Sequence, residues 1–269
     1  MTLAAGITRI VAPNAGMMTG PGTNTYVLGV EEVAVLDPGP DDPAHLQAIL
    51  NAVTGVIRWI LVTHTHRDHS PLAARLARRT TAQLIGLEPP RDGRQDETFT
   101  PDRLPVDGER LEFGDFRLTA IHTPGHASNC VCYLHDEARL LFTGDHVLEG
   151  VTPVILPPDG DMAAYFASLA KLSQYDFERI APGHGRVMDR GQRVITLLHA
   201  HRLARENKVL AVLNVLGAAD LERLTPAVYD DVAADRHRWA KLTLEAHLIK
   251  LEREGRVRVV GGEWQPNRE

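Results

Sequence analysis

The sequence Thr63-His64-Thr65-His66-Arg67-Asp68-His69-Ser70 follows directly on the apolar run Trp59-Ile60-Leu61-Val62. The run is typical of a short strand buried on both faces, so the histidines and the aspartate would lie at the edge of a sheet. Neutral imidazole nitrogens and carboxylate oxygens are ligands that zinc, iron and manganese accept in proteins. The stretch therefore predicts a metal site at the end of a rigid strand.

The spacing within this stretch favours two metal ions. Residues two apart in an extended chain point to the same side, so His64 and His66 can bind one ion. Ser70-Pro71 is typical of a helix cap and first helical residue, so the chain would turn there and let Asp68 and His69 reach a second ion. The alternative is a solvated loop in a chain with 13 histidines. We favour the metal site because His-x-His-x-Asp-His at a strand end is a specific pattern.

Three later polar residues each follow an apolar strand and a glycine: His126 after Gly125, Asp145 after Gly144, and His184 after Gly183. Glycine at such a position lets the backbone approach a site closely. A single histidine of this kind would usually be turn chemistry. The joint occurrence of all three at strand ends indicates that they belong to the same site.

The rest of the first 190 residues is predicted to alternate between strands and helices. Asp42-Pro43 has the order of a helix cap and first helical residue. The polar stretch from Glu88 to Gly108, with four prolines, is predicted to be a surface loop that either borders a substrate cleft or is simply solvated. One predicted strand ends at residue 28, and the others cover residues 33–36, 56–62, 82–86, 116–122, 130–134, 139–143 and 177–181. The predicted helices cover residues 43–53, 71–79 and 162–172.

The pattern changes after about Arg193. The sequence predicts a helix over residues 193–215, a short helix opened by Thr225-Pro226, a helix over residues 239–254, and a hairpin around Gly261-Gly262. Three helices followed by a hairpin are typical of a winged-helix module, which often binds DNA. Between Asp220 and Arg258, however, eight Lys and Arg residues are balanced by eight Asp and Glu residues, which disfavours duplex DNA as a partner.

Composition and charge limit the function further. The net charge of −6 gives no electrostatic reason to expect a nucleic-acid or membrane partner. No apolar run approaches the ~20 residues of a membrane span, and the start lacks a secretory signal, so we expect a cytoplasmic protein. Cys130 and Cys132 alternate along one predicted strand, a geometry that rarely allows a disulfide, and two small buried side chains are favoured over metal ligands. The oligomeric state stays open.

The motif His64-x-His66-x-Asp68-His69 resembles the signature of the metallo-β-lactamase superfamily. The resemblance implies an α/β fold, the αββα sandwich, with one or two metal ions at the sheet edges. It implies that Asp37 supports the site without binding metal, and the alternative is that Asp37 serves only the turn. It also implies that Asp68 both binds metal and is the catalytic residue that orients the nucleophile. The implied ligands are His64, His66 and His126 for the first ion, Asp68, His69 and His184 for the second, and Asp145 as a bridge.

Further segments resemble a glyoxalase II-like branch that carries a C-terminal winged-helix domain. A departure is Ala127-Ser128-Asn129-Cys130, where many superfamily members carry Thr-x-Gly, and this leaves the substrate contacts beside His126 open. Residues 1–192 are predicted to form the catalytic domain, and residues 193–269 a linker helix and a winged-helix-like domain. The segments that resemble this glyoxalase II-like branch are Gly22-Thr23-Asn24-Thr25-Tyr26, Phe142-Thr143-Gly144-Asp145-His146-Val147-Leu148, Ala181-Pro182-Gly183-His184-Gly185, His201-Arg202-x-x-x-Arg205-Glu206 and Leu248-x-x-Leu251-Glu252-x-Glu254-Gly255.

The expected function is metal-dependent hydrolysis. Two divalent ions would share a water, lower its pKa toward neutrality and present it to the substrate as a bridging hydroxide. Zinc is the first candidate for both ions, and iron and manganese are alternatives. Precedent in the resembling branch favours endoribonuclease action on single-stranded RNA. The alternatives are hydrolysis of a small ester or thioester of the hydroxyacylglutathione type, and a metal-dependent regulator whose winged helix binds DNA.

Overall fold

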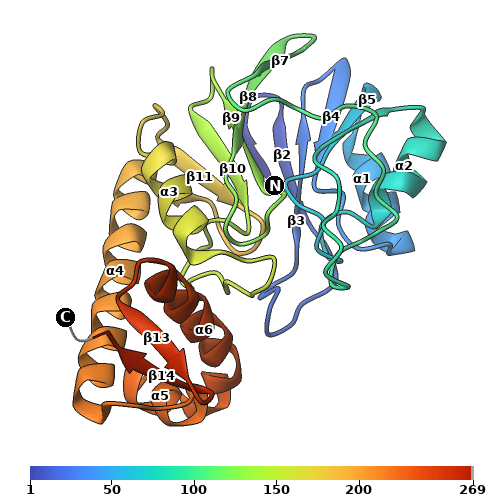
Figure 1. Cartoon of the computed structure of the whole chain (residues 1–269). Coiled ribbons are helices and arrows are strands. Elements are labelled where there is room, and N and C mark those ends of the chain that lie inside the picture. Colours follow the sequence, from blue (N-terminus) through green and yellow to red (C-terminus); the bar gives the residue numbers. More distant parts are fainter. Residues whose placement is uncertain (268–269) are drawn as a thin grey trace.

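The computed structural model describes residues 1–267, and two six-stranded sheets face each other at its centre (Figure 1). Each sheet is built from one continuous part of the chain. The first sheet consists, in spatial order, of β1 (Thr2–Ala4), β2 (Ile7–Val11), β3 (Asn24–Leu28), β4 (Glu32–Leu36), β5 (Val56–Leu61) and β6 (Gln83–Ile85). The second consists of β12 (Met188–Asp189), β11 (Arg179–Pro182), β10 (Leu140–Gly144), β9 (Val131–His135), β8 (Phe116–His122) and β7 (Arg110–Phe113).

Helices cover the outer face of each sheet, which gives the αββα sandwich that the sequence predicts. α1 and α2 bury Ile49 and Leu76 against the first sheet. α3 and the start of α4 bury Leu169 and Ile195 against the second. The helices are α1 (Pro43–Ala52), α2 (Leu72–Thr80), α3 (Met162–Leu172), α4 (Gly191–Leu216), α5 (Leu221–Val228), the 3-10 turn η1 (Ala234–Arg236) and α6 (His237–Arg253).

The two sheets are held together by an apolar core. Tyr26 on β3 and Phe142 on β10 approach with ring centres 4.9 Å apart, and both are buried. Aromatic pairs at this separation add to the free energy that burial of their area contributes. The facing strands are therefore fixed relative to one another, and so are the residues at their ends.

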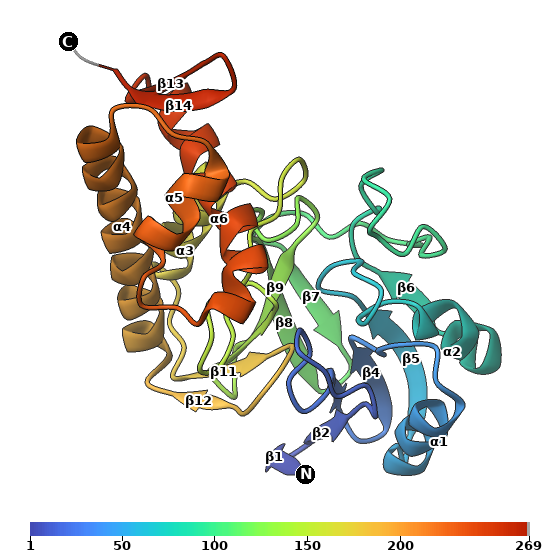
Figure 2. The ribbon, with the colours of Figure 1, turned by 90° about the horizontal axis from the view of Figure 1, so that it is seen from below.

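The last part of the chain has a core of its own. Leu213 of α4, Leu224 of α5 and Leu248 of α6 form a buried cluster with Trp264, from the hairpin of β13 (Val257–Val260) and β14 (Glu263–Pro266). This order of helices and hairpin is the predicted one. Figure 2 shows α4 and α6 beside α3, and Ala246 of α6 is buried in the cluster that also contains α3. The C-terminal helices therefore pack directly on the sandwich.

Two predicted helix starts are wrong. Thr225-Pro226 does not open a helix, because α5 begins at Leu221 and its cap is Asp220, whose carboxylate accepts a hydrogen bond of 2.9 Å from the backbone N–H of Arg223. Ser70 does not cap α2 either: its hydroxyl donates to Asp96 at 2.7 Å. In the first case a carboxylate earlier in the chain caps the helix. In the second case the hydroxyl expected to cap the helix binds a carboxylate far along the chain instead.

Within residues 1–267, no helix combines the length and the apolar character that crossing a membrane requires. The cytoplasmic location expected from the sequence stays a prediction.

Candidate metal centre

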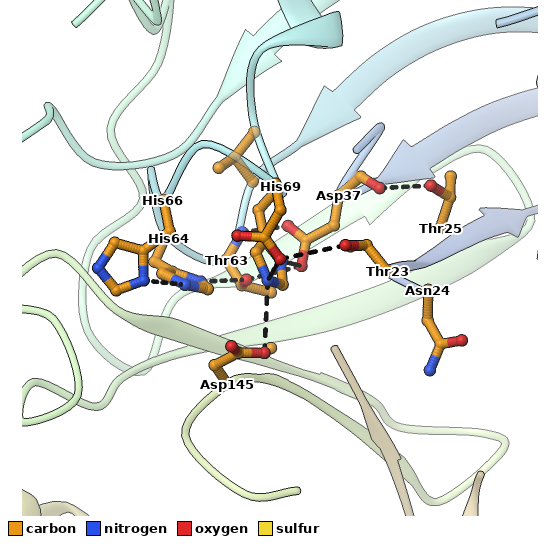
Figure 3. Close-up of polar contacts among 12 residues, drawn as sticks. Thr23, Asn24, Thr25, Asp37, Thr63, His64, His66, His69 and Asp145 are labelled. Carbon is orange, nitrogen blue, oxygen red and sulfur yellow. Dashed lines mark hydrogen bonds and ion pairs between the residues drawn. The ribbon is translucent and has the colours of Figure 1, made fainter. Parts of the chain in front are cut away.

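The seven predicted ligands gather at one edge of the sandwich. Figure 3 shows four of them, His64, His66, His69 and Asp145. Four follow β5, and the others follow β8, β10 and β11, where the chain leaves its sheet. Three groups have ligand atoms that all lie within 4.8 Å of one another. The groups are His64, His66 and His126; His64, His69 and Asp145; and Asp68, His69 and His184.

The first group brings three imidazole nitrogens together. Nδ1 of His66 lies 3.0 Å from Nε2 of His64 and 3.0 Å from Nε2 of His126. Burial lowers the pKa of all three histidines, that of His66 to about 3, so the rings are neutral. A single proton on His66 can serve only one neighbour, which leaves unprotonated nitrogens facing each other. A metal ion with nitrogen ligands fits such an arrangement.

Four of the five histidines make an outer hydrogen bond through Nδ1, which turns Nε2 inward. This pattern sets the tautomer and the ring orientation of metal-binding histidines. The acceptors are Thr63 Oγ1 for His64 at 3.1 Å, Asp37 Oδ2 for His69 at 2.9 Å, the Val154 carbonyl for His126 at 2.8 Å and the Gly22 carbonyl for His184 at 3.2 Å.

The four remaining residues combine two imidazoles with two carboxylates. Nε2 of His69 lies 3.3 Å from Asp68 and 3.3 Å from Asp145, and Nε2 of His184 lies 3.1 Å and 3.3 Å from the same carboxylates. Burial disfavours the charged form of both histidines, but the carboxylates outweigh it and raise their pKa values, that of His184 to about 10. Burial alone would raise the pKa values of Asp68 and Asp145, but the neighbouring histidines outweigh it and lower them, so both carboxylates are ionised.

Asp145 lies between the three histidines of the first group and the pair of His69 and His184. Its Oδ2 is 4.0 Å from Nε2 of His126 and 3.3 Å from Nε2 of His184, while its buried Oδ1 has no hydrogen-bond partner. The buried Nε2 of His69 also lacks a hydrogen-bond partner. These two atoms lie 3.3 Å apart without forming a hydrogen bond. Buried polar atoms without a hydrogen-bond partner are costly, and a cation bound by both would satisfy them. The donor set fits two divalent ions with Asp145 as a common ligand.

Asp37 supports the gathered side chains, as the family resemblance implies. Its carboxylate accepts hydrogen bonds from the backbone N–H and the hydroxyl of Thr63, both at 2.7 Å, and from His69. Its backbone adopts a positive φ of 48°, a conformation that aspartate tolerates better than most residues. Asp37 therefore orients both the start of the histidine motif and one of its rings.

Thr23 is a supporting residue whose role the sequence does not predict, although it lies in the quoted segment that begins at Gly22. Its hydroxyl donates to Oδ2 of Asp68 at 3.1 Å and is itself held by the side-chain amide of Asn14 at 2.9 Å. Among the seven gathered residues, Asp68 has the most exposed carboxylate, with 27% of its side chain accessible. Thr23 thus fixes the more accessible of the two carboxylates.

The segment from Glu88 to Gly108 forms no helix or strand but is not simply solvated. Gln95 is buried and accepts a hydrogen bond of 3.0 Å from the hydroxyl of Thr65. The same hydroxyl accepts a bond of 2.7 Å from the amide of Asn129, which belongs to the segment that departs from the superfamily pattern. Asn129 is buried and holds the Thr65 side chain, so the segment that departs from the superfamily pattern supports the histidine motif.

The cysteines are buried side chains on and beside β9. Cys130 and Cys132 are free, and burial raises both pKa values, that of Cys132 to about 12. Among residues 1–267, neither cysteine belongs to a group with metal-binding geometry. The same holds for His146, which is fully buried beside Tyr165 at a ring separation of 4.6 Å.

Comparisons with known families match both parts of the chain. The family described as Metallo-beta-lactamase superfamily matches residues 18–184, which contain all seven gathered side chains. The family described as Beta-lactamase associated winged helix domain matches residues 221–264. The winged-helix prediction is thereby confirmed.

Known relatives match most of the chain. A protein named Beta-lactamase-like protein 2 homolog, from Drosophila melanogaster, is 30% identical over 96% of this chain and 91% of its own length. A protein named Atrochrysone carboxyl ACP thioesterase, from Aspergillus fumigatus, is 28% identical over 98% of this chain and 88% of its own length. The crystal structure of a metallo-beta-lactamase family protein from Thermus thermophilus superposes with a TM-score of 0.82 at 24% identity, covering 99% of this chain and 100% of that one.

Proposed function

The chain belongs to the metallo-beta-lactamase superfamily of hydrolases, and on this premise we propose that seven of its residues hold two divalent metal ions for hydrolysis. His64, His66 and His126 would hold one ion, Asp68, His69 and His184 the other, and Asp145 both. The observation that carries the proposal is the convergence of five imidazole rings and two ionised carboxylates on one centre. Such ions, when bound, supply Lewis acidity that activates water and polarises the attacked carbonyl or phosphoryl oxygen.

The protein residues have distinct roles in this proposal. Asp68 accepts a hydrogen bond from the attacking water and orients it, since its carboxylate is the accessible one and Thr23 holds it in place. Asp145 is largely buried and supplies negative charge between the two groups. Asp37 keeps His69 in the required tautomer. Zinc, iron and manganese all suit this donor set.

A thioester is the substrate class that we place first. Support comes from the relative named as an acyl-carrier-protein thioesterase, which aligns with nearly the whole chain. The net charge of −6 also offers no general attraction for a polyanion.

Single-stranded RNA is the second candidate, because one surface feature suits it. The guanidinium of Arg238 lies 4.9 Å from the centre of the Trp239 ring at the start of α6, and Arg238 also contacts Met17 at 3.3 Å. A cationic and aromatic pair of this kind stacks on bases and contacts phosphate.

One panel of substrates separates these candidates. The metal-loaded wild type and its His64→Ala variant are incubated with lactoylglutathione, an acyl thioester of pantetheine, single-stranded RNA, duplex DNA and a cephalosporin. Thioester cleavage that the variant loses supports our first choice, whereas RNA cleavage alone replaces it with the second. A protein that carries both ions and cleaves none of the five substrates contradicts both choices.

Metal content tests the centre itself. Protein remetallated with zinc or manganese is expected to hold two ions per chain by elemental analysis, since seven ligands exceed the four of one tetrahedral zinc site. A stoichiometry of one would overturn the two-ion proposal.

We further propose that residues 1–192 perform catalysis and that residues 193–269 support them. The seven proposed ligands all precede residue 185, and the winged-helix match begins at residue 221. The rival hypothesis is a regulator that binds DNA, which the balanced charges of the tail disfavour. Tight, sequence-dependent binding of duplex DNA in gel shifts at two salt concentrations would revive it.

A further inference from the structure

We propose that Arg202 of α4 is a positioning residue for His126, acting through the segment of residues 153–161, which we call the bridging segment. The inference rests on the proposed function in one respect only, since it takes His126 as a metal ligand. It gives the C-terminal helices a role in the metal centre, because they hold one of its imidazoles in the binding orientation.

The bridging segment contacts the loop that carries His126. The Val154 carbonyl accepts the hydrogen bond from Nδ1 of His126 at 2.8 Å, and this bond is what leaves Nε2 free to face His66. The carboxylate of Asp159 accepts a bond of 2.9 Å from the backbone N–H of Ser128. The position of the bridging segment therefore sets the orientation of the His126 ring.

The same segment contains no helix or strand, so its position depends on contacts with its neighbours. The C-terminal helices supply several of them. Arg202 of α4 donates to the Pro153 carbonyl, the residue directly before Val154. The backbone N–H of Ile155, directly after it, donates to the hydroxyl of Thr243 on α6 at 3.4 Å. Helices from the end of the chain thus hold both sides of the carbonyl that orients His126.

Arg202 is built into the interior rather than placed at the surface. Only 3% of the residue is exposed, and its guanidinium lies 5.1 Å from the centre of the Tyr165 ring. The hydroxyl of Tyr165 donates to the backbone carbonyl of His146, next to Asp145, at 2.8 Å. A buried cation is costly unless its partners are well placed. In this structure the planar guanidinium of Arg202 contacts both the bridging segment and Tyr165 of α3, the helix that covers the second sheet.

The neighbouring charged residues of the His201-Arg202-x-x-x-Arg205-Glu206 motif face elsewhere. Arg205 donates to the carboxylate of Asp231 at 2.7 Å and 2.8 Å, within the C-terminal part. Glu206 accepts a bond of 2.7 Å from Lys250 of α6. Arg205 is, like Arg202, a buried cation, but its hydrogen bonds go to Val228 and Asp231 and not to the bridging segment, and this makes it a matched control.

The experiment compares Arg202→Gln with Arg205→Gln by chelator competition, with circular dichroism to verify the fold. In Arg202→Gln we expect the affinity for one of the two ions to fall by about 10- to 100-fold, the usual effect of removing an outer support of a ligand, while the other ion is retained. Arg205→Gln is expected to lower the melting temperature and to keep both ions. Thr243→Val and Thr243→Ser form a second pair, in which only the valine variant loses the acceptor for Ile155 and should release the same ion more easily.

Each result decides something. A folded Arg202→Gln variant that retains both ions like the wild type overturns the inference, as does an equal loss of metal in Arg205→Gln. If Arg202→Gln does not fold, the threonine pair decides, and equal metal affinity in its two members overturns the inference. Wild-type protein that binds no metal would instead contradict the proposed function, so the two failures are distinguishable.

Discussion

Asp37 accepts a hydrogen bond of 2.9 Å from Nδ1 of His69, although the two residues are 32 positions apart in the chain. The same carboxylate accepts the backbone N–H and the hydroxyl of Thr63. Each of the three groups that contact the two carboxylate oxygens of Asp37 is a hydrogen-bond donor. The end of β4 is thereby tied to the end of β5 and to one ring of the metal centre.

Replacing Asp37 with Asn tests this dependence, because the amide has a single acceptor oxygen and turns two N–H donors toward Thr63 and His69. We expect Asp37→Asn to weaken the affinity for the ion at His69 by about 10- to 100-fold. Elemental analysis after dialysis against a chelator measures the loss. Retention of both ions would show that the outer hydrogen bond is dispensable.

Gly183→Ala tests the packing of the centre. A β-carbon at Gly183 would lie 2.4 Å from Oδ1 of Asp145 and 2.7 Å from Cε1 of His69, yet the backbone of Gly183 does not have a positive φ. The added methyl is expected to displace both side chains, at a cost of about 1–3 kcal/mol in stability, and to lower metal content.

The matched control is Gly16→Ala, whose β-carbon would meet nothing closer than the Thr19 hydroxyl at 3.3 Å. Calorimetric melting and elemental analysis should show little change in this control. Equal metal content in the two variants would contradict the predicted crowding at Gly183.

Asp145→Ala and Cys130→Ser separate a shared ligand from a buried neighbour. Because Asp145 faces both groups, its loss should lower the content of both ions and hydrolysis together while the fold is preserved. Cys130 belongs to neither group and its serine variant should keep both ions. Metal stripped by the cysteine change but not by the aspartate change would refute the ligand assignment.

Glu206→Gln should make stability depend less on pH. Burial alone would raise the pKa of Glu206, but hydrogen bonds from His247 and Lys250 favour the carboxylate, and its net pKa is lowered. Its contribution to stability is therefore present above its unfolded pKa of about 4.5 and is lost as the pH falls through the lower, folded value.

At pH 7 the Glu206→Gln variant is expected to lose about 3 kcal/mol of unfolding free energy, as when one partner leaves a buried ion pair. Melting curves of wild type and variant from pH 7 to pH 3 should converge only below about pH 4.5. A difference in melting temperature that stays constant down to pH 3 would contradict the assigned role of the carboxylate.

The gathering of the seven side chains can be predicted from sequence because its signals are local. Each of the later residues His126, Asp145 and His184 stands at a strand end beside a glycine, and sheet topology brings those ends together. The strands β1, β2 and β7 have no such signal, since they are short and partly exposed at or near the sheet edges. Their pairing is decided by neighbours far along the chain.

The supports of the centre are harder to read from sequence. The Val154 carbonyl fixes His126, but a backbone carbonyl carries no information about residue type. Thr23, Asn129 and Arg202 lie in segments that the sequence marks as unusual, yet their partners are 45, 64 and 49 positions away. Only the folded structure shows which of many distant groups each side chain meets.

The order of the two sheets along the chain has a consequence for biosynthesis. β1 to β6 end at Ile85 and β7 to β12 begin at Arg110, yet each proposed ion takes ligands from both halves. On the ribosome, His64 and His69 emerge well before His184, so the nascent chain offers an incomplete and weaker binding set until synthesis has passed that residue. Metal loading is thus expected to follow the folding of each half and then to lock the two halves together, as a late step of maturation.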